Sequence, residues 1–223
     1  MNHRTFNSLI AAATLLSAGA ALANAPAEKP AQLKIACVGD SITFGARIEN
    51  REANCYPAQL GALMGEKATV KNFGVSGTTL LKKGNKPYWK RPQYKAALEF
   101  NPDIVVIKLG TNDTKPDNWK HKSEYVPNYV ALIESFRKLP SKPEVWVCYP
   151  VPAYPNKGPI SGTVVKEEIL PMIDEIAKQT GVKIIDLHTP LANQQALFPD
   201  SIHPNAAGAK IIAETVKAAI AGK

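Results

Sequence analysis

Four residues in this sequence combine a nucleophile, a base, an orienting acid and an amide donor. Ser41 lies in Gly-Asp-Ser-Ile-Thr, Asn112 in Gly-Thr-Asn-Asp, and Asp200 and His203 in Asp-Ser-Ile-His-Pro. A serine hydroxyl is a weak nucleophile at neutral pH and needs a base, and a neutral imidazole can take a proton near pH 7. Asp200 stands three residues before His203 and could hold its Nδ1 proton. These residue types favour acyl transfer through Ser41.

The elements that must position these residues alternate between strands and helices. Short apolar or β-branched runs predict strands, and the run Ile104–Leu109 is typical of a strand buried on both faces. The predicted strands are Leu33–Val38, Ala68–Phe73, Ile104–Leu109, Val145–Tyr149 and Val182–Leu187. The predicted helices are Tyr56–Met64, Pro92–Phe100, Glu124–Leu139, Val164–Thr180 and a last helix from Pro204 to about Ile220.

Alternating strands and helices predict a parallel sheet with right-handed crossovers. We expect a three-layer α/β/α, flavodoxin-like domain with five strands in the order 2-1-3-4-5. In such a sheet, function gathers at the carboxyl ends of the strands. The motifs that contain Ser41 and Asn112, the segment after the second strand (residues 72–77), and the Asp200–His203 segment should therefore meet at one edge.

With these motifs in this order, the sequence resembles the GDSL or SGNH hydrolase family over residues 33–220. The first motif reads Gly-Asp-Ser-Ile instead of Gly-Asp-Ser-Leu. The resemblance implies Ser41 as nucleophile, His203 as base and Asp200 as its partner. It also implies an oxyanion hole built from the backbone N–H groups of Ser41 and Gly74 and the side-chain amide of Asn112. Asp113 is expected to order the loop after the third strand.

The resemblance implies ester hydrolysis, and compact family members favour short acyl chains. The region around Lys82-Lys83-Gly84-Asn85-Lys86 and Gly110–Pro116 is similar to family members that act as carbohydrate or sialate O-acetylesterases. Four aromatic residues could form a sugar-stacking wall, although aromatic side chains also serve as ordinary core residues. They are Tyr88, Trp89, Trp119 and Tyr149.

Two alternatives remain open for the activity. One is a lysophospholipase or thioesterase on the same fold, which would need an apolar acyl groove. The other is a glycan-binding module that has lost catalysis. Chain-length preference on aryl esters separates the first from an acetylesterase, and turnover that depends on Ser41 excludes the second.

The sequence lacks the motifs typical of metal binding, phosphate binding, dinucleotide binding and the nucleophile elbow of larger α/β-hydrolases. The sequence contains no His-x-x-x-His or Cys-x-x-Cys pair, no phosphate-binding loop, no Gly-x-Gly-x-x-Gly and no Gly-x-Ser-x-Gly. We therefore expect no metal and no cofactor, and we interpret His121 and His188 as structural. The net charge of +8 is dispersed rather than gathered in a basic run, which argues against a nucleic-acid partner.

The N-terminal segment has the pattern of an export signal. Arg4 precedes the apolar run Leu9–Leu22, and Ala21-Leu22-Ala23 is a small-x-small cleavage site. We predict a signal peptide at 1–23, a tether at 24–32 and a hydrolase domain at 33–223. The protein would then be periplasmic or secreted, without stable membrane insertion.

The three cysteines are Cys37, Cys55 and Cys148. Cys37 and Cys148 lie in predicted strands that a third strand separates, which places them about 10 Å apart and beyond disulfide reach. We expect buried free thiols, with a disulfide from Cys55 as the minor alternative.

Overall fold

The computed structural model describes residue 1, residues 32–155 and residues 157–221. The chain divides into a unit of residues 1–31 and a unit of residues 32–223. Apart from Met1 and Gln32, the predicted signal peptide and tether lie outside the described residues. The account below concerns the second unit.

The second unit contains a parallel sheet of five strands in the order β2-β1-β3-β4-β5. The strands are β1 (Leu33–Gly39), β2 (Ala68–Gly74), β3 (Ile104–Lys108), β4 (Glu144–Tyr149) and β5 (Lys183–Asp186). Both the strand order and the three-layer α/β/α architecture predicted from the sequence are confirmed.

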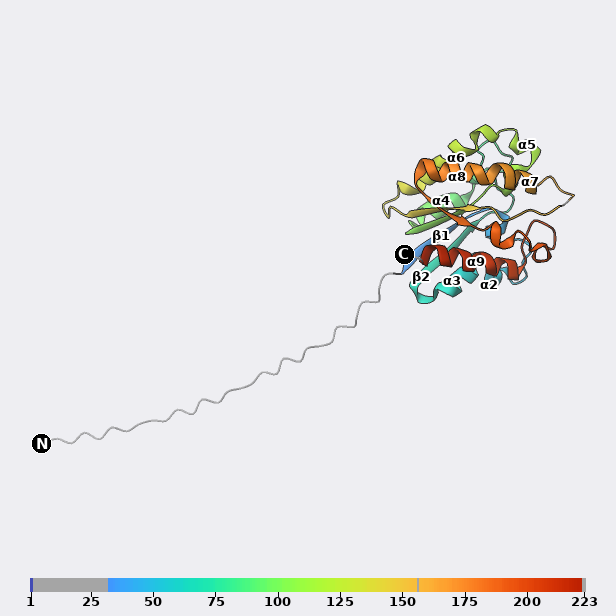
Figure 1. Ribbon diagram of the computed structural model, residues 1–223. Helices are drawn as coiled ribbons and strands as arrows, with labels where there is room; N and C mark the ends of the chain where they lie inside the picture. The colour runs from blue at the N-terminus through green and yellow to red at the C-terminus, as the bar shows by residue number, and fades with distance from the viewer. Residues whose placement is uncertain (2–31, 156, 222–223) are drawn as a thin grey trace. The chain divides into compact units, whose positions relative to one another are not determined.

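Helices cover both faces of the sheet (Figure 1). On one face lie α3 (Tyr56–Met64) and α9 (Ala206–Ala221), and on the other lie α4 (Pro92–Glu99), α6 (Tyr125–Arg137) and α8 (Leu170–Thr180). Each face has its own apolar core, because successive strand side chains point to opposite sides. The sheet is thereby held rigidly between two packed helical layers.

The strand register brings the ends of three strands side by side. Gly39 at the end of β1 pairs with Gly74 of β2 and with Lys108 of β3. The segments that follow these residues therefore leave the sheet at the same edge. This register explains how the motifs at Ser41 and Asn112 come together although 70 residues of chain separate them.

Shorter helical segments connect the main elements. They are α1 (Ser41–Phe44), α2 (Arg51–Asn54), α5 (Pro116–Trp119), α7 (Gly162–Val164), the π-helix Val165–Ile169, and the 3-10 turns Gly65–Lys67, Tyr88–Lys90, Thr111–Thr114, Lys122–Glu124, Thr189–Leu191 and Gln195–Leu197.

Two predicted helices differ from the observed ones. The helix expected over Val164–Thr180 is divided into α7, a π-helix and α8. Pro171 has no N–H to donate to the preceding turn, and π-turns accommodate such interruptions. The last helix begins at Ala206 instead of Pro204, because the Asn205 side chain accepts from the Gly208 N–H at 3.0 Å and so caps the helix.

All three cysteines are buried free thiols, so the disulfide from Cys55 is not formed. Burial raises the pKa of Cys37 to about 12, which makes its thiol unreactive. Within the described residues, we find no helix with the length and apolarity needed to cross a membrane.

Candidate active site

Ser41, His203 and Asp200 form a continuous hydrogen-bonded chain. His203 Nε2 lies 2.8 Å from Ser41 Oγ, and His203 Nδ1 lies 2.7 Å from Asp200 Oδ2. A carboxylate oxygen can only accept, so Nδ1 carries the proton and Nε2 faces the serine hydroxyl as an acceptor. The tautomer required of a general base is therefore built into the site.

A tight turn holds Asp200 and His203 in this arrangement. Asp200 Oδ1 accepts from the backbone N–H groups of Ile202 at 3.1 Å and His203 at 2.7 Å, and Ser201 has a positive φ of 67°. Burial acts to raise the pKa of Asp200, but the hydrogen bonds from His203 and Ile202 outweigh it and lower the pKa below its ordinary value. Asp200 is accordingly charged at neutral pH.

Arg47 places a cation beside Asp200. Its Nε lies 2.9 Å from Asp200 Oδ2, the oxygen that also binds His203 Nδ1. Arg47 has a φ of 65°, a conformation that few residues other than glycine adopt. This contact with the candidate catalytic carboxylate is not predicted by the sequence motifs.

Ser41 is the first residue of the short helix α1, and a buried ion pair supports the start of that helix. Asp40 Oδ1 accepts from the Ile42 N–H at 2.9 Å and caps the helix. Lys108 Nζ lies 3.1 and 3.0 Å from the two Asp40 oxygens and 2.7 Å from Thr111 Oγ1. One buried ammonium thus joins the turn that carries Ser41 to the turn that carries Asn112.

The strand pattern alone predicts only that Lys108 is buried. A lysine within a run of apolar residues is nevertheless a signal of a paired buried charge. Desolvation lowers the pKa of Lys108, while Asp40 acts in the opposite direction. Its three amine hydrogens have three acceptors, so the buried charge is fully paired.

Asn72 is a third residue whose role the sequence motifs do not predict. Its Nδ2 donates to the carbonyl oxygens of Thr43 at 2.9 Å and Phe44 at 3.3 Å, at the end of α1. Its Oδ1 accepts from the Gly74 N–H at 2.9 Å. Asn72 therefore fastens the segment after β2 to the helix that begins at Ser41.

Two of the three predicted oxyanion donors are suitably placed. The Ser41 N–H lies at the first position of α1, where an N–H has no intrahelical acceptor. The Asn112 amide donates one hydrogen to the Thr78 carbonyl at 3.1 Å and has a second hydrogen to offer. Asn118 donates to the Asn112 carbonyl at 2.8 Å and holds this turn in place.

Gly74, the third predicted oxyanion donor, does not have a free N–H group. Its N–H already donates to Asn72, and a Cβ at this residue would lie 2.3 Å from the Phe44 nitrogen. Glycine is needed here for close packing against α1. Gly77 is the better donor: its φ is +81°, and its N–H forms no hydrogen bond within the described part of the chain. The adjacent Thr78 accepts from Asn112, so Gly77 lies beside that amide.

Asp113 joins the loop after β3, which it is expected to order, to the segment after β2. Its two carboxylate oxygens accept from the backbone N–H groups of Leu81 at 2.8 Å and Leu80 at 3.0 Å. Burial raises the pKa of Asp113 to about 7, although the two backbone N–H groups oppose the shift.

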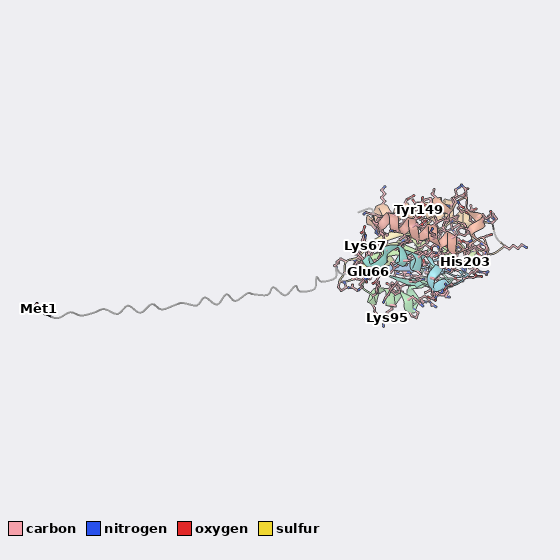
Figure 2. All side chains as sticks on the ribbon, turned by 90° about the horizontal axis from the view of Figure 1, so that it is seen from below. Met1, Glu66, Lys67, Lys95, Tyr149 and His203 are labelled. Atoms are coloured by element: carbon pink, nitrogen blue, oxygen red, sulfur yellow. The ribbon has the colours of Figure 1, made fainter. Side chains whose placement is uncertain are left out.

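Two members of the expected sugar-stacking wall, Tyr88 and Trp119, are buried and cannot stack on a sugar. Tyr88 is fully buried with its hydroxyl on the Phe73 carbonyl, and Trp119 is 8% exposed in the same core. Trp89 donates to the Leu80 carbonyl and packs against this core. Tyr149 turns toward Asp174 of α8 and lies apart from His203 in Figure 2. Tyr88 and Trp119 therefore act as ordinary core residues, the alternative stated for these aromatic side chains, whereas Trp89 and Tyr149 are partly buried.

A small polar pocket of about 260 Å³ adjoins the histidine. Its lining consists of Arg47, Pro199, Asp200, His203, Pro204 and Asn205. In the part of the chain that the structure describes, no cluster of His, Cys, Asp and Glu could hold a metal ion.

A parallel five-stranded α/β/α sheet with a Ser-His-Asp chain at its carboxyl edge defines a class of serine hydrolases. Residues 37–211 match the GDSL-like lipase/acylhydrolase family, and the chain belongs to this family. The resemblance inferred from the sequence motifs is thus confirmed.

The chain is similar to an acetylxylan esterase from Xylanibacter ruminicola, with 42% identity over 89% of this chain and 45% of the relative. It therefore spans less than half the length of that relative. The fold is similar to that of a carbohydrate acetylesterase from Sinorhizobium meliloti (TM-score 0.69, 18% identity, 86% of this chain and 99% of the other). It is also similar to that of a two-domain esterase active on acetylated mannans (TM-score 0.63, 21% identity, 86% and 50%).

Proposed function

We propose that this protein is a serine esterase that removes acetyl groups from carbohydrates. The observation that carries the proposal is the contact of 2.8 Å between Ser41 Oγ and His203 Nε2, with Asp200 on the other ring nitrogen. The similarity to an acetylxylan esterase supports an acetylated glycan as the substrate.

The mechanism follows from the geometry. His203 Nε2 takes the Ser41 proton as Oγ attacks the acetyl carbonyl, and Asp200 stabilises the imidazolium that forms. The N–H groups of Ser41 and Gly77 and the Asn112 amide stabilise the oxyanion. His203 then gives the proton to the departing sugar oxygen, which leaves an acetyl-Ser41 ester. His203 deprotonates a water molecule that attacks this ester, and then gives that proton to Ser41 Oγ as acetate is released.

The similarity to an acetylxylan esterase favours a short acyl group. The pocket of about 260 Å³ beside His203 is lined by neither Ser41 nor Asn112, so it is not the acyl site. A long acyl tail would require an apolar groove, and the chain-length preference of the enzyme tests the lysophospholipase and thioesterase alternative. The intact hydrogen-bonded chain argues against a module that only binds glycans.

The test is hydrolysis of p-nitrophenyl esters from acetate to decanoate, with acetylated xylan as the polymer substrate. We expect a rate maximum at acetate, release of acetate from xylan, and loss of both activities in Ser41→Ala with the fold retained. A maximum at octanoate or beyond would move the assignment to lipid or thioester substrates. Unchanged activity in Ser41→Ala would overturn the mechanism.

Export is a separate part of the proposal. The apolar run after Arg4 and the Ala21-Leu22-Ala23 site support it. N-terminal sequencing of the protein recovered from a bacterial periplasm or culture medium tests it. A start at Asn24 is expected, whereas an uncleaved chain retained in the cytoplasm would contradict it.

A further inference from the structure

A second and larger hollow lies at the carboxyl edge of the sheet. It has a volume of about 830 Å³, within the usual range of ligand sites of about 300–1,000 Å³. Its walls come from the segment after β4, from the α7 and π-helix region, and from the segment after β5. We call it the β4–β5 groove. Ligands of open α/β sheets bind outside the carboxyl ends of strands, where this groove lies.

The β4–β5 groove is joined directly to the turn that carries Asp200 and His203. Tyr154 is part of its lining, and its backbone N–H donates to the Ser201 carbonyl at 2.8 Å. The Tyr154 ring packs against Phe198 with centroids 5.1 Å apart. The Tyr154 hydroxyl also accepts from the Gln194 N–H at 2.9 Å. The groove wall and the catalytic turn therefore form one hydrogen-bonded unit.

His188 provides a fixed polar group in this groove. Its Nδ1 lies 3.0 Å from the Pro150 carbonyl, which can only accept, so Nδ1 carries the hydrogen of the neutral ring. Asp186 Oδ1 accepts from the backbone N–H groups of His188 and Thr189, both at 2.9 Å. Nε2 is then an acceptor for a hydroxyl donor, and no described residue donates to it. The structural role predicted for His188 explains the Nδ1 contact with Pro150 but leaves Nε2 available to a ligand.

The opposite wall carries balanced charge. Lys166 and Glu167 line the groove from the π-helix, a kind of turn that is frequent at functional sites. One cation and one anion give the wall donors and acceptors without a net charge. Together with Thr163 and Asn193, this composition suits a neutral ligand rich in hydroxyl groups better than an anion or an acyl tail.

We propose that the β4–β5 groove binds the neutral sugar chain that carries the acetyl ester, on the side of the acetylated residue next to Tyr154. This assignment rests on the proposed esterase function and deepens it. Sugar hydroxyls donate to His188 Nε2 and exchange hydrogen bonds with the charged wall. The groove thereby distinguishes a glycan ester from a small ester that only reaches Ser41.

Two variants test whether the β4–β5 groove binds the sugar chain, one by removing a hydrogen-bond acceptor and the other by filling the groove. His188→Ala removes the acceptor, and Ala192→Trp adds bulk at an exposed groove residue without removing a side-chain hydrogen bond. For each, kcat/KM is measured on an acetylated xylohexaose and on p-nitrophenyl acetate. We expect the ratio of the two values to fall about fivefold in His188→Ala, since one neutral hydrogen bond contributes about 1 kcal/mol. A larger fall is expected in Ala192→Trp.

Gln179→Ala is the matched control. Gln179 lines a different hollow of about 650 Å³ between α6 and α8, so its substitution should leave the ratio at the wild-type value. A ratio unchanged in both His188→Ala and Ala192→Trp, with their thermal stability retained, would overturn the proposal.

Direct binding separates this proposal from the proposed function. Calorimetric titration of the wild-type protein with unacetylated xylohexaose needs no catalysis. Weaker binding by Ala192→Trp than by the wild type supports the groove even if neither ester is hydrolysed. Absence of binding, or equal affinity in the two proteins, overturns the groove while Ser41-dependent turnover would still support the esterase.

Discussion

Lys108 and Asp40 form an ion pair with both side chains fully buried. Asp40 caps the helix that begins at Ser41, and Lys108 also contacts Thr111, the neighbour of Asn112. A buried ion pair is costly to assemble and costly to break, because an unpaired charge is left in the interior. We interpret it as the device that holds the nucleophile turn and the Asn112 turn at a constant separation.

Lys108→Met should therefore destabilise the protein by about 3–5 kcal/mol, the usual cost of removing one partner of a buried pair. Denaturant unfolding measures the loss. Lys210→Met is the control, because Lys210 forms an exposed pair with Glu214 in α9 and should cost about 0.5 kcal/mol or less. Equal losses in the two variants would show that the buried pair has no special role.

Asn112→Ala should lower kcat about 10²- to 10³-fold, as expected for the loss of one oxyanion donor. KM should change much less, because the interaction strengthens only as the oxyanion forms. Asn128→Ala is the control: Asn128 is a buried amide that accepts from the Lys82 N–H at 2.8 Å, away from the Ser41 turn. If kcat fell equally in both variants, Asn112 would have no specific part in catalysis.

Alanine at the two glycines should have different effects. In Gly74→Ala the new Cβ meets the backbone of α1, so we expect a loss of stability of about 1–3 kcal/mol. In Gly77→Ala no backbone atom is among the contacts, and the positive φ alone costs about 1–2 kcal/mol. That strain turns the Gly77 N–H away, so kcat should fall at least tenfold. Full kcat in Gly77→Ala would exclude this residue as an oxyanion donor.

Asp113 should make stability depend on pH between about 4 and 7. Its pKa is raised by burial to about 7 in the folded protein and is about 3.9 in an unfolded chain. Between these values the folded state binds the extra proton, so the contribution of Asp113 is most favourable at the acid end and is lost as pH rises to 7. Melting temperatures of the wild type and Asp113→Asn at pH 5 and pH 7.5 measure it.

The difference between wild type and variant isolates this contribution from other titrating groups. We expect the wild type to lose more stability than Asp113→Asn between pH 5 and pH 7.5, because Asn cannot ionise. A parallel change in the two proteins would show that Asp113 keeps one protonation state throughout.

The strands, their order and the candidate reacting groups could be predicted from the sequence alone. Apolar β-branched runs such as Ile104–Ile107 and the Gly-Asp-Ser motif before Ser41 are local patterns, readable one segment at a time. Alternation of strands and helices leaves few topologies, and a parallel sheet places the segments after its strands at one edge.

Tertiary structure decided what each neighbour of Ser41 does. Asn72 Oδ1 accepts from the Gly74 N–H, so Gly77 and not Gly74 has an N–H available for the oxyanion. The burial of Tyr88 and the pairing of Lys108 with Asp40 join residues far apart in the chain. Hydrogen bonds and burial at such distances arise only when the layers pack, and no local pattern of residue types specifies them.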